Sequence, residues 1–270
     1  MIDNLACRRG GRLLFEAVSA QVAPGGALLL TGPNGAGKSS LLRLLAGLLR
    51  AEAGSVSGGG RRAFAGHDVA LKPRQSLGAE LDYWARLDGG RDCLPGALAA
   101  MNLAGLVDVP CRHLSSGQKR RAAIARVIAA GAECWLLDEP TAGVDVELRQ
   151  TLWQFIAKLN KQGHTVLLTT HYLEEAEALC GRIAMLKQGR VVALDRTSEL
   201  LRSASSNVLR FKLDAALPPE LASKARVVGR IVQLPAHDAA EIERHLSAVR
   251  QAGLVAEDVE IRKADLEDVF

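Results

Sequence analysis

Short apolar runs alternate with longer segments of helical period through the first 200 residues. Three of these runs, at 27–31, 134–137 and 165–169, are nearly all apolar, and polar residues follow each of them. Such runs are typical of buried parallel strands that are joined by crossover helices. The pattern therefore predicts an α/β fold in which ligands bind at the C-terminal ends of the strands.

The stretch between the first two of these strands contains a long segment with no convincing strand. It carries apolar side chains at helical spacing, among them Leu77, Leu81, Trp84, Ala85, Leu98, Met101, Ala122, Ile124, Ala125, Val127 and Ile128. This spacing predicts a helical subdomain at about 76–130. Further along the chain, 183–187 and 190–195 flank Gln188-Gly189, which indicates a β-hairpin that closes the domain.

A change of composition divides the chain near its last quarter. Small polar residues at 203–207 separate the hydrophobic periods on either side. We place a domain boundary there, with one domain at 1–202 and a second at 203–270. Beyond the boundary, apolar runs at 208–213, 226–234 and 255–262 and a helical pattern at 239–251 predict a small α+β module.

Composition narrows the class of protein. The 270 residues are 48% hydrophobic and 24% charged, which is typical of a globular chain. No apolar run approaches the ~20 residues of a spanning helix, and the start lacks the apolar core of ~7–15 residues of a signal peptide. The five cysteines are scattered without a C-x-x-C pair, which indicates reduced thiols. We therefore expect a cytoplasmic chain.

The charge and the histidines bear on the kind of ligand. The formal net charge is +4, and the basic excess lies in the first 202 residues, which favours an anionic ligand. The six histidines show no H-E-x-x-H or H-x-x-x-H spacing, so nothing in the sequence favours a zinc site.

The strongest local motif follows the first buried strand. Residues 32–39 fit the phosphate-loop pattern G-x-x-x-x-G-K-[ST], and the helical run 41–49 follows them. Backbone N–H groups of such a loop wrap a polyphosphate, Lys38 adds a cation for the β and γ phosphates, and the Ser39 hydroxyl is the expected Mg²⁺ ligand. We expect the following residues to bind ATP: Gly32, Pro33, Asn34, Gly35, Ala36, Gly37, Lys38, Ser39 and Ser40.

A second motif lies at the end of the second buried strand, where Asp138 and Glu139 are adjacent. Burying two carboxylates without a cation is costly, so the pair indicates a magnesium site. Asp138 would hold the ion, and Glu139 would orient or deprotonate the water that attacks the γ-phosphate. The alternative is that the two carboxylates cap the next helix.

Three further motifs resemble those of one family, the ATP-binding subunits of ABC transporters. The segment 114–118, Leu-Ser-Ser-Gly-Gln, resembles the family's signature. The segment 141–145 resembles its D-loop, and Thr170-His171 resembles its switch-histidine loop. Together with the phosphate loop and the Asp138-Glu139 strand, these motifs cover roughly residues 1–200.

The resemblance implies a head-to-tail dimer, in which ATP on one subunit's phosphate loop is capped by the other subunit's signature. It adds to the expected nucleotide site the residues Ser115, Ser116, Gly117, Gln118 and Asp145, and it makes His171 a ligand of the γ-phosphate. The basic run Lys119, Arg120 and Arg121 is interpreted as the solvated face of a helix. We expect no nucleic-acid partner.

Two positions depart from the family pattern. His67 stands where the family's Q-loop has glutamine, and Gly66-His67 resembles the haem-exporter ATPase of cytochrome c maturation. A histidine meets Mg²⁺ or water only as neutral imidazole, so we expect coupling to the partner to depend on pH. Arg9 or Arg8 stands where the family offers an aromatic ring to adenine, and we expect a guanidinium stack with weak base selectivity.

The end of the chain points to another branch of the family. Its closing residues 266–270, Leu-Glu-Asp-Val-Phe, resemble the C-terminal module of type-2 ABC exporters, which haem-exporter subunits usually lack. We interpret this module as a small solubilising or dimer-supporting cap, with a ligand-sensing domain as the alternative.

These motifs predict the ATP-hydrolysing motor subunit of an ABC exporter. It would bind Mg²⁺ and ATP, pair with a second copy of itself, and drive a separate membrane permease at the inner face of the cell membrane. The alternatives are a haem-exporter subunit for cytochrome c biogenesis and a soluble ABC ATPase acting on DNA or ribosomes. The short spacing between phosphate loop and signature and the single cassette disfavour the soluble class. A phosphate-loop kinase or GTPase would not need the signature.

Overall fold

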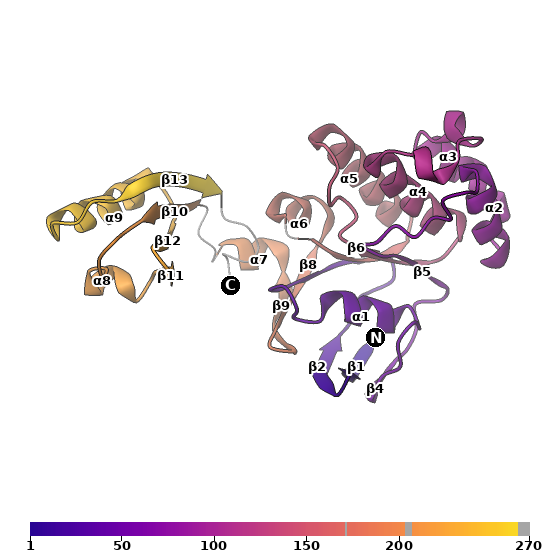
Figure 1. Cartoon of the computed structure of the whole chain (residues 1–270). Helices are drawn as coiled ribbons and strands as arrows, with labels where there is room; N and C mark the ends of the chain where they lie inside the picture. The colour runs from indigo at the N-terminus through magenta and orange to yellow at the C-terminus, as the bar shows by residue number, and fades with distance from the viewer. Residues whose placement is uncertain (171, 203–206, 264–270) are drawn as a thin grey trace. The chain divides into compact units, whose positions relative to one another are not determined.

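The computed structural model describes residues 1–170, 172–202 and 207–263 of the chain. The chain forms two compact units, Met1–Thr197 and Ser198–Phe270 (Figure 1).

The first unit is built on a six-stranded sheet with the order β5-β6-β7-β3-β8-β9. Its strands are β3 (Ala27–Thr31), β5 (Arg62–Ala65), β6 (Cys134–Asp138), β7 (Thr165–Thr169), β8 (Arg182–Lys187) and β9 (Arg190–Arg196). All neighbours are parallel except β8 and β9, which form the expected hairpin. Because β5, β6, β7 and β3 are parallel, their C-terminal ends meet at one edge of the sheet, as the strand pattern predicts.

One face of this sheet packs on α1 (Lys38–Leu45) and on a second, antiparallel sheet of β2 (Arg12–Ala20), β1 (Ile2–Arg9) and β4 (Ala53–Val56). The sequence pattern did not reveal these three strands. Alternate residues such as Leu28, Leu30 and Leu136 point into this core, and each buried leucine contributes roughly 1.5–3 kcal/mol.

Helices lie on the other side of the sheet from α1 (Figure 1). They are α2 (Leu77–Leu87), α3 (Leu94–Ala100), α4 (Ser116–Ala129), α5 (Val146–Lys161) and α6 (Leu173–Leu179), with short 3₁₀ turns at Arg91–Cys93, Ala104–Leu106 and Cys111–His113. The expected helical character of 76–130 is confirmed by α2 to α4, which share one apolar core. Ser76 starts α2 by accepting a hydrogen bond from the Ala79 N–H.

The interpretation of the basic run on α4 as a solvated face is wrong for Arg120. Its side chain is buried, and its Nη1 donates to the carbonyl oxygen of Gly66 at 3.2 Å. Arg121 also turns inward, and donates to the carbonyl oxygens of Met101 and Asn102 at 3.0 and 3.3 Å. A charged side chain can leave the solvent when backbone carbonyls accept its hydrogen bonds, as they do for the Nη1 groups of both arginines.

The second unit is an antiparallel sheet with the order β11-β12-β10-β13. Its elements are α7 (Thr197–Arg202), β10 (Asn207–Lys212), α8 (Pro219–Ala222), β11 (Arg226–Val228), β12 (Ile231–Ala236), α9 (Ala239–Gln251) and β13 (Glu257–Lys263). The single strand expected at 226–234 is two strands, because Gly229 turns the chain at a φ of 61°. The closing motif at 266–270 lies outside the described residues.

All five cysteines are free thiols, as their scatter predicts, and only Cys93 is exposed. Within the described ranges, the helices are too short or too polar to cross a membrane.

Candidate functional site

The phosphate loop, residues 32–39, joins the end of β3 to the start of α1. Gly35 and Gly37 have φ values of 80° and 101°, a backbone region that favours glycine. A Cβ atom on Gly32 would lie 2.0 Å from the carbonyl oxygen of Leu186 in β8. Gly35 and Gly37 are therefore required by the turn of the loop, and Gly32 is required by the close approach of the Leu186 carbonyl.

Lys38 is the first residue of α1, and only 7% of it is exposed. Its Nζ donates to the carbonyl oxygens of Gly32 at 2.5 Å and Pro33 at 3.2 Å, so the amine lies across the loop. Within the described part of the chain, no side chain caps the start of α1. The N–H groups of its first turn are thus available to an anion, beside a buried cation.

Asp138 ends β6 and is 1% exposed. Its Oδ1 accepts hydrogen bonds from the Ser39 hydroxyl at 3.0 Å and from the Thr169 hydroxyl at 2.8 Å. Its Oδ2 is buried and has no hydrogen-bond partner among the residues that the structure describes. The phosphate loop and the β6 carboxylate, which lie far apart in the sequence, therefore meet as predicted, and one carboxylate oxygen is left for a cation.

Glu139 follows at the same edge of the sheet. Its N–H donates to the carbonyl oxygen and the hydroxyl of Thr169, at 3.2 and 2.9 Å. Its φ is +50°, which is uncommon for a residue other than glycine and is found at functional sites. Its carboxylate is 24% exposed, and Oε2 lies 3.4 Å from Nδ1 of His67. The two adjacent acids thus differ: Asp138 is enclosed, and Glu139 reaches the solvent.

His67 lies after the end of β5 and is 54% exposed. The carbonyl of the preceding residue, Gly66, accepts the hydrogen bond from Arg120 of α4. Burial lowers the pKa of the Arg120 guanidinium, and the charges of Glu139, Asp138 and Asp68 raise it, but an arginine stays protonated. Arg120 thus ties the loop that carries His67 to α4. Sequence reasoning missed this role, because a basic run gives no sign of burial.

The signature residues form the start of α4. The Ser115 hydroxyl accepts from the N–H of Gln118 at 3.2 Å, and the Gln118 side chain accepts from the N–H of Ser115 at 2.8 Å. This capping box satisfies two backbone donors reciprocally. The donors that remain for an anion at the start of α4 are therefore the N–H groups of Ser116 and Gly117.

Three further residues of the predicted nucleotide site are Asp145, His171 and Arg9. Asp145 is exposed and begins α5, where its Oδ1 accepts from the N–H of Leu148 at 2.8 Å. His171 lies outside the described residues. Arg9 ends β1, and its Cα lies opposite that of Arg12. A cavity of ≈ 370 Å³ beside the phosphate loop is lined by Arg12 and by residues 33–36, and Arg9 is not among its lining residues.

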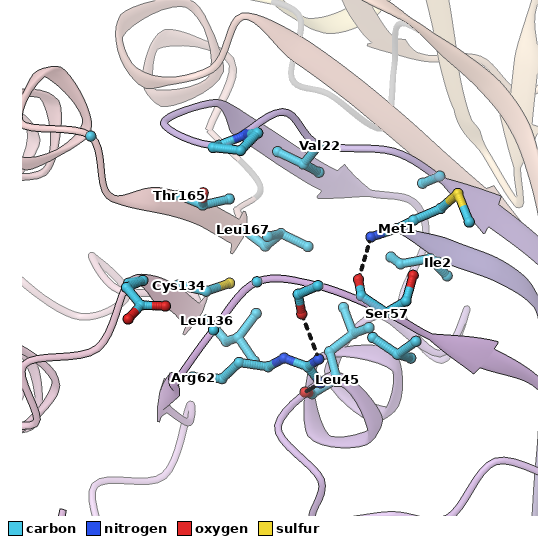
Figure 2. Close-up of a pocket in the computed structure, with 18 residues that line it drawn as sticks. Met1, Ile2, Val22, Leu45, Ser57, Arg62, Cys134, Leu136, Thr165 and Leu167 are labelled. Carbon is cyan, nitrogen blue, oxygen red and sulfur yellow. Dashed lines mark hydrogen bonds between the residues drawn. The ribbon is translucent and has the colours of Figure 1, made fainter.

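Another cavity, of ≈ 350 Å³, lies at the opposite edge of the parallel sheet. It is lined by Cys134 and Thr165, the first residues of β6 and β7, and by apolar side chains such as Leu136 and Leu167 (Figure 2). Arg62 is held at its wall by the carbonyl oxygens of Leu45 and Gly58, each at 2.9 Å. None of the predicted site residues lines it, so the cavity is separate from the phosphate site.

Fold and site together define a class of protein. The sequence profile of the ABC transporter family matches residues 15–142. A solved ATP-binding subunit of an ABC transporter superposes with a TM-score of 0.67 at 24% identity, covering 74% of this chain and 91% of that one. A dimeric ATP-binding cassette bound to ADP and Pi gives 0.65 at 22% identity, covering 73% of this chain and 97% of that one. Both likenesses confirm the predicted fold.

Closer relatives are curated export proteins. The cytochrome c biogenesis ATP-binding export protein CcmA of Gluconobacter oxydans is 46% identical over 63% of this chain and 80% of its own length. Its counterpart from Sphingopyxis alaskensis is 48% identical, over 63% and 89%. The chain therefore belongs to the ATP-binding subunits of ABC transporters and is an ATPase, as its motifs predict.

Proposed function

We propose that the chain is the motor subunit of an ABC exporter, which binds Mg²⁺ and ATP between two copies of itself and drives a separate membrane permease. The observation that carries this proposal is the meeting of Lys38, Ser39, Asp138 and Glu139 at one edge of the sheet. Through its permease, the chain would act at the inner face of the membrane.

In this proposal the residues 32–40 wrap the phosphates, and Lys38 supplies the fixed cation. Glu139 is the base, because it is the more exposed of the two acids and lies beside space that water can enter. His67, 3.4 Å from Glu139, would link the γ-phosphate end of the site to the helical region that meets the permease. Arg9, at the end of β1, and Arg12, at the start of β2, would face the adenine ring of ATP.

The residues present fit a magnesium ion. The orphaned Oδ2 of Asp138 and the adjacent Ser39 hydroxyl are oxygen ligands of the kind that Mg²⁺ prefers, and the ion usually completes its shell with water and phosphate oxygens. Among the described residues, no cluster of three or more His, Cys, Asp or Glu competes for a metal. When bound, the ion would neutralise charge on the β and γ phosphates.

The head-to-tail dimer is tested by complementation between two inactive variants. Lys38→Ala disables the phosphate loop, and Gly117→Asp places a negative charge at the anion-binding start of α4. Each variant alone should hydrolyse ATP at a small fraction of the wild-type rate. In a two-fold head-to-tail dimer, an equal mixture restores one intact site per heterodimer, so about a quarter of the wild-type rate should return.

The measurement is phosphate release by the full chain at several mixing ratios. A mixture that stays as inactive as its components would contradict sites shared between subunits. The control is a mixture of Lys38→Ala with the double variant Lys38→Ala/Gly117→Asp, which has no intact site in any pairing and should remain inactive.

We propose that the exporter serves cytochrome c biogenesis, which is the alternative that Gly66-His67 suggests. The similarity to cytochrome c biogenesis export proteins supports this assignment over the type-2 exporters that the closing motif 266–270 resembles. Deleting the gene should abolish covalently bound haem in membrane and periplasmic proteins, as measured by haem staining. Restoration by the wild-type gene but not by Glu139→Gln is expected, and normal haem staining in the deletion strain would overturn the assignment.

We also propose the functional division of the chain. Residues 1–202 would form the ABC ATPase domain, with 76–130 as the helical subdomain that transmits motion, and 203–270 would be a C-terminal cap. The cap has its own apolar core, which includes Leu209, Phe211 and Leu234. A separate core supports a module that is added to the motor without changing its chemistry.

A further inference from the structure

A buried carboxylate lies close to the catalytic edge of the sheet without belonging to any of the sequence motifs. Glu175 is on α6 and is 0% exposed. Its Oε2 accepts a hydrogen bond from the Thr141 hydroxyl at 3.0 Å and another from the Thr170 hydroxyl. Both threonines are themselves buried, with exposures of 1% and 2%. A charged group seldom occupies such a place unless its hydrogen bonds matter to the fold or the site.

The two threonines belong to the two segments that hold the proposed catalytic residues. Thr141 lies two residues after Glu139, on the turn that leaves β6. Thr170 directly follows Thr169, whose carbonyl and hydroxyl accept the N–H of Glu139 and whose hydroxyl donates to Asp138. One carboxylate oxygen therefore joins the turn that carries the base to the loop that leaves β7.

A third segment lies close to this carboxylate. Arg149 and Trp153 are on α5, the helix that Asp145 begins, and both lower the pKa of the Glu175 carboxyl, which burial raises. Arg149 also lies over the Tyr172 ring, 4.0 Å from its centre. The N–H of Tyr172 donates to the Thr170 hydroxyl at 3.1 Å. The segments after β6 and after β7 are thus connected around Glu175.

We propose that Glu175 is a positioning residue of the ATPase site: by holding the hydroxyls of Thr141 and Thr170, it fixes the turn of Glu139 relative to the loop that leaves β7. It does not touch the nucleotide. The inference rests on the proposed catalytic role of Glu139. Because the contacts of Lys38 lie at the phosphate loop, loss of Glu175 should disturb the placement of the base and leave nucleotide binding intact.

The test compares Glu175→Leu, which fills the volume but accepts no hydrogen bond, with Glu175→Gln, which keeps a carbonyl acceptor. Misplacing a catalytic group by about 1 Å lowers the reaction rate by up to ~100-fold. We therefore expect the kcat of Glu175→Leu to fall by roughly 10- to 100-fold. The Kd for ATP should stay within about twofold. Glu175→Gln should regain most of the lost rate. Glu177→Leu, on an exposed position of the same helix, is the matched control.

Two further variants separate positioning from general destabilisation, and they decide the matter if Glu175→Leu does not fold. Thr141→Val and Thr170→Val each remove one hydroxyl and keep the side-chain shape. Each should lower kcat without changing the Kd for ATP, and their combined effect should be smaller than the product of the two, because they share one acceptor.

The outcomes distinguish this inference from the function on which it rests. The inference is wrong if the wild-type protein hydrolyses ATP and its kcat is unchanged in Glu175→Leu and in both valine variants. Glu175 would then be a structural residue only. A parallel fall of kcat and nucleotide affinity in the threonine variants would also overturn the inference. If Glu139→Gln hydrolyses ATP at the wild-type rate, the assigned base is wrong and the proposed function fails first.

Discussion

Glu139→Gln should bind ATP as the wild type does, while its hydrolysis rate falls by roughly 10²–10⁴-fold, the usual span for removal of a general base. The glutamine amide keeps the shape of the side chain but has no oxygen that can take the proton from water. Because the N–H contacts of residue 139 with Thr169 are made by the backbone, the substitution leaves the turn in place. Phosphate release and calorimetric ATP binding are the two measurements.

A second consequence of the same variant is a change of assembly. Since ATP persists, dimers should accumulate with ATP and be visible by light scattering. Glu177→Gln, which makes the same chemical change at an exposed position of α6, should behave as wild type. Hydrolysis near the wild-type rate in pure Glu139→Gln would show that another group handles the water.

Lys38→Ala should weaken ATP binding itself. A hydrogen bond to a charged group is worth about 1.5–3 kcal/mol, which corresponds to a Kd roughly 10- to 150-fold higher. The loss has two sources, because Nζ would bind the phosphates and in the structure it also joins the carbonyl oxygens of Gly32 and Pro33. Calorimetry with a non-hydrolysed ATP analogue measures the effect.

A volume-matched variant separates the loss of the amine from the loss of side-chain packing. Lys38→Met keeps most of the buried packing and removes only the amine, so it should bind ATP as weakly as Lys38→Ala if charge dominates. Lys158→Ala removes the same charge from an exposed position of α5 and is the control. An unchanged affinity for ATP in both Lys38 variants would show that the phosphate loop is not part of the ATP-binding site.

The parts of the fold that the sequence predicts are those with a regular period. The buried parallel strands, the helices of 76–130 and α9 all have uninterrupted apolar patterns. The antiparallel sheet of β1, β2 and β4 does not. Its pairing is shifted between Ile2 and Leu5 and again between Leu5 and Cys7, and Asn4 and Ala17 have positive φ values. These irregularities break the alternation of period two on which a strand prediction depends.

The same contrast holds for the site. Residues in motifs of fixed spacing, such as Lys38 and Asp138, could be predicted because their chemistry dictates their neighbours in sequence. Arg120 and Glu175 could not be, because charged residues in a helical pattern are expected at the surface. Their burial depends on carbonyl and hydroxyl partners that come from other segments, and only the assembled fold brings those partners together.

In the proposed dimer, the capping box of α4 would affect how the two copies of the chain associate. Each subunit already holds the start of its signature helix in a fixed conformation, with Ser115 and Gln118 bonded to one another. The N–H groups of Ser116 and Gly117 therefore need no ordering when a phosphate arrives from the other subunit. Less conformational entropy is lost on association than if this segment were a flexible loop. The affinity between the subunits would then depend on the γ-phosphate, which is present before hydrolysis and released after it.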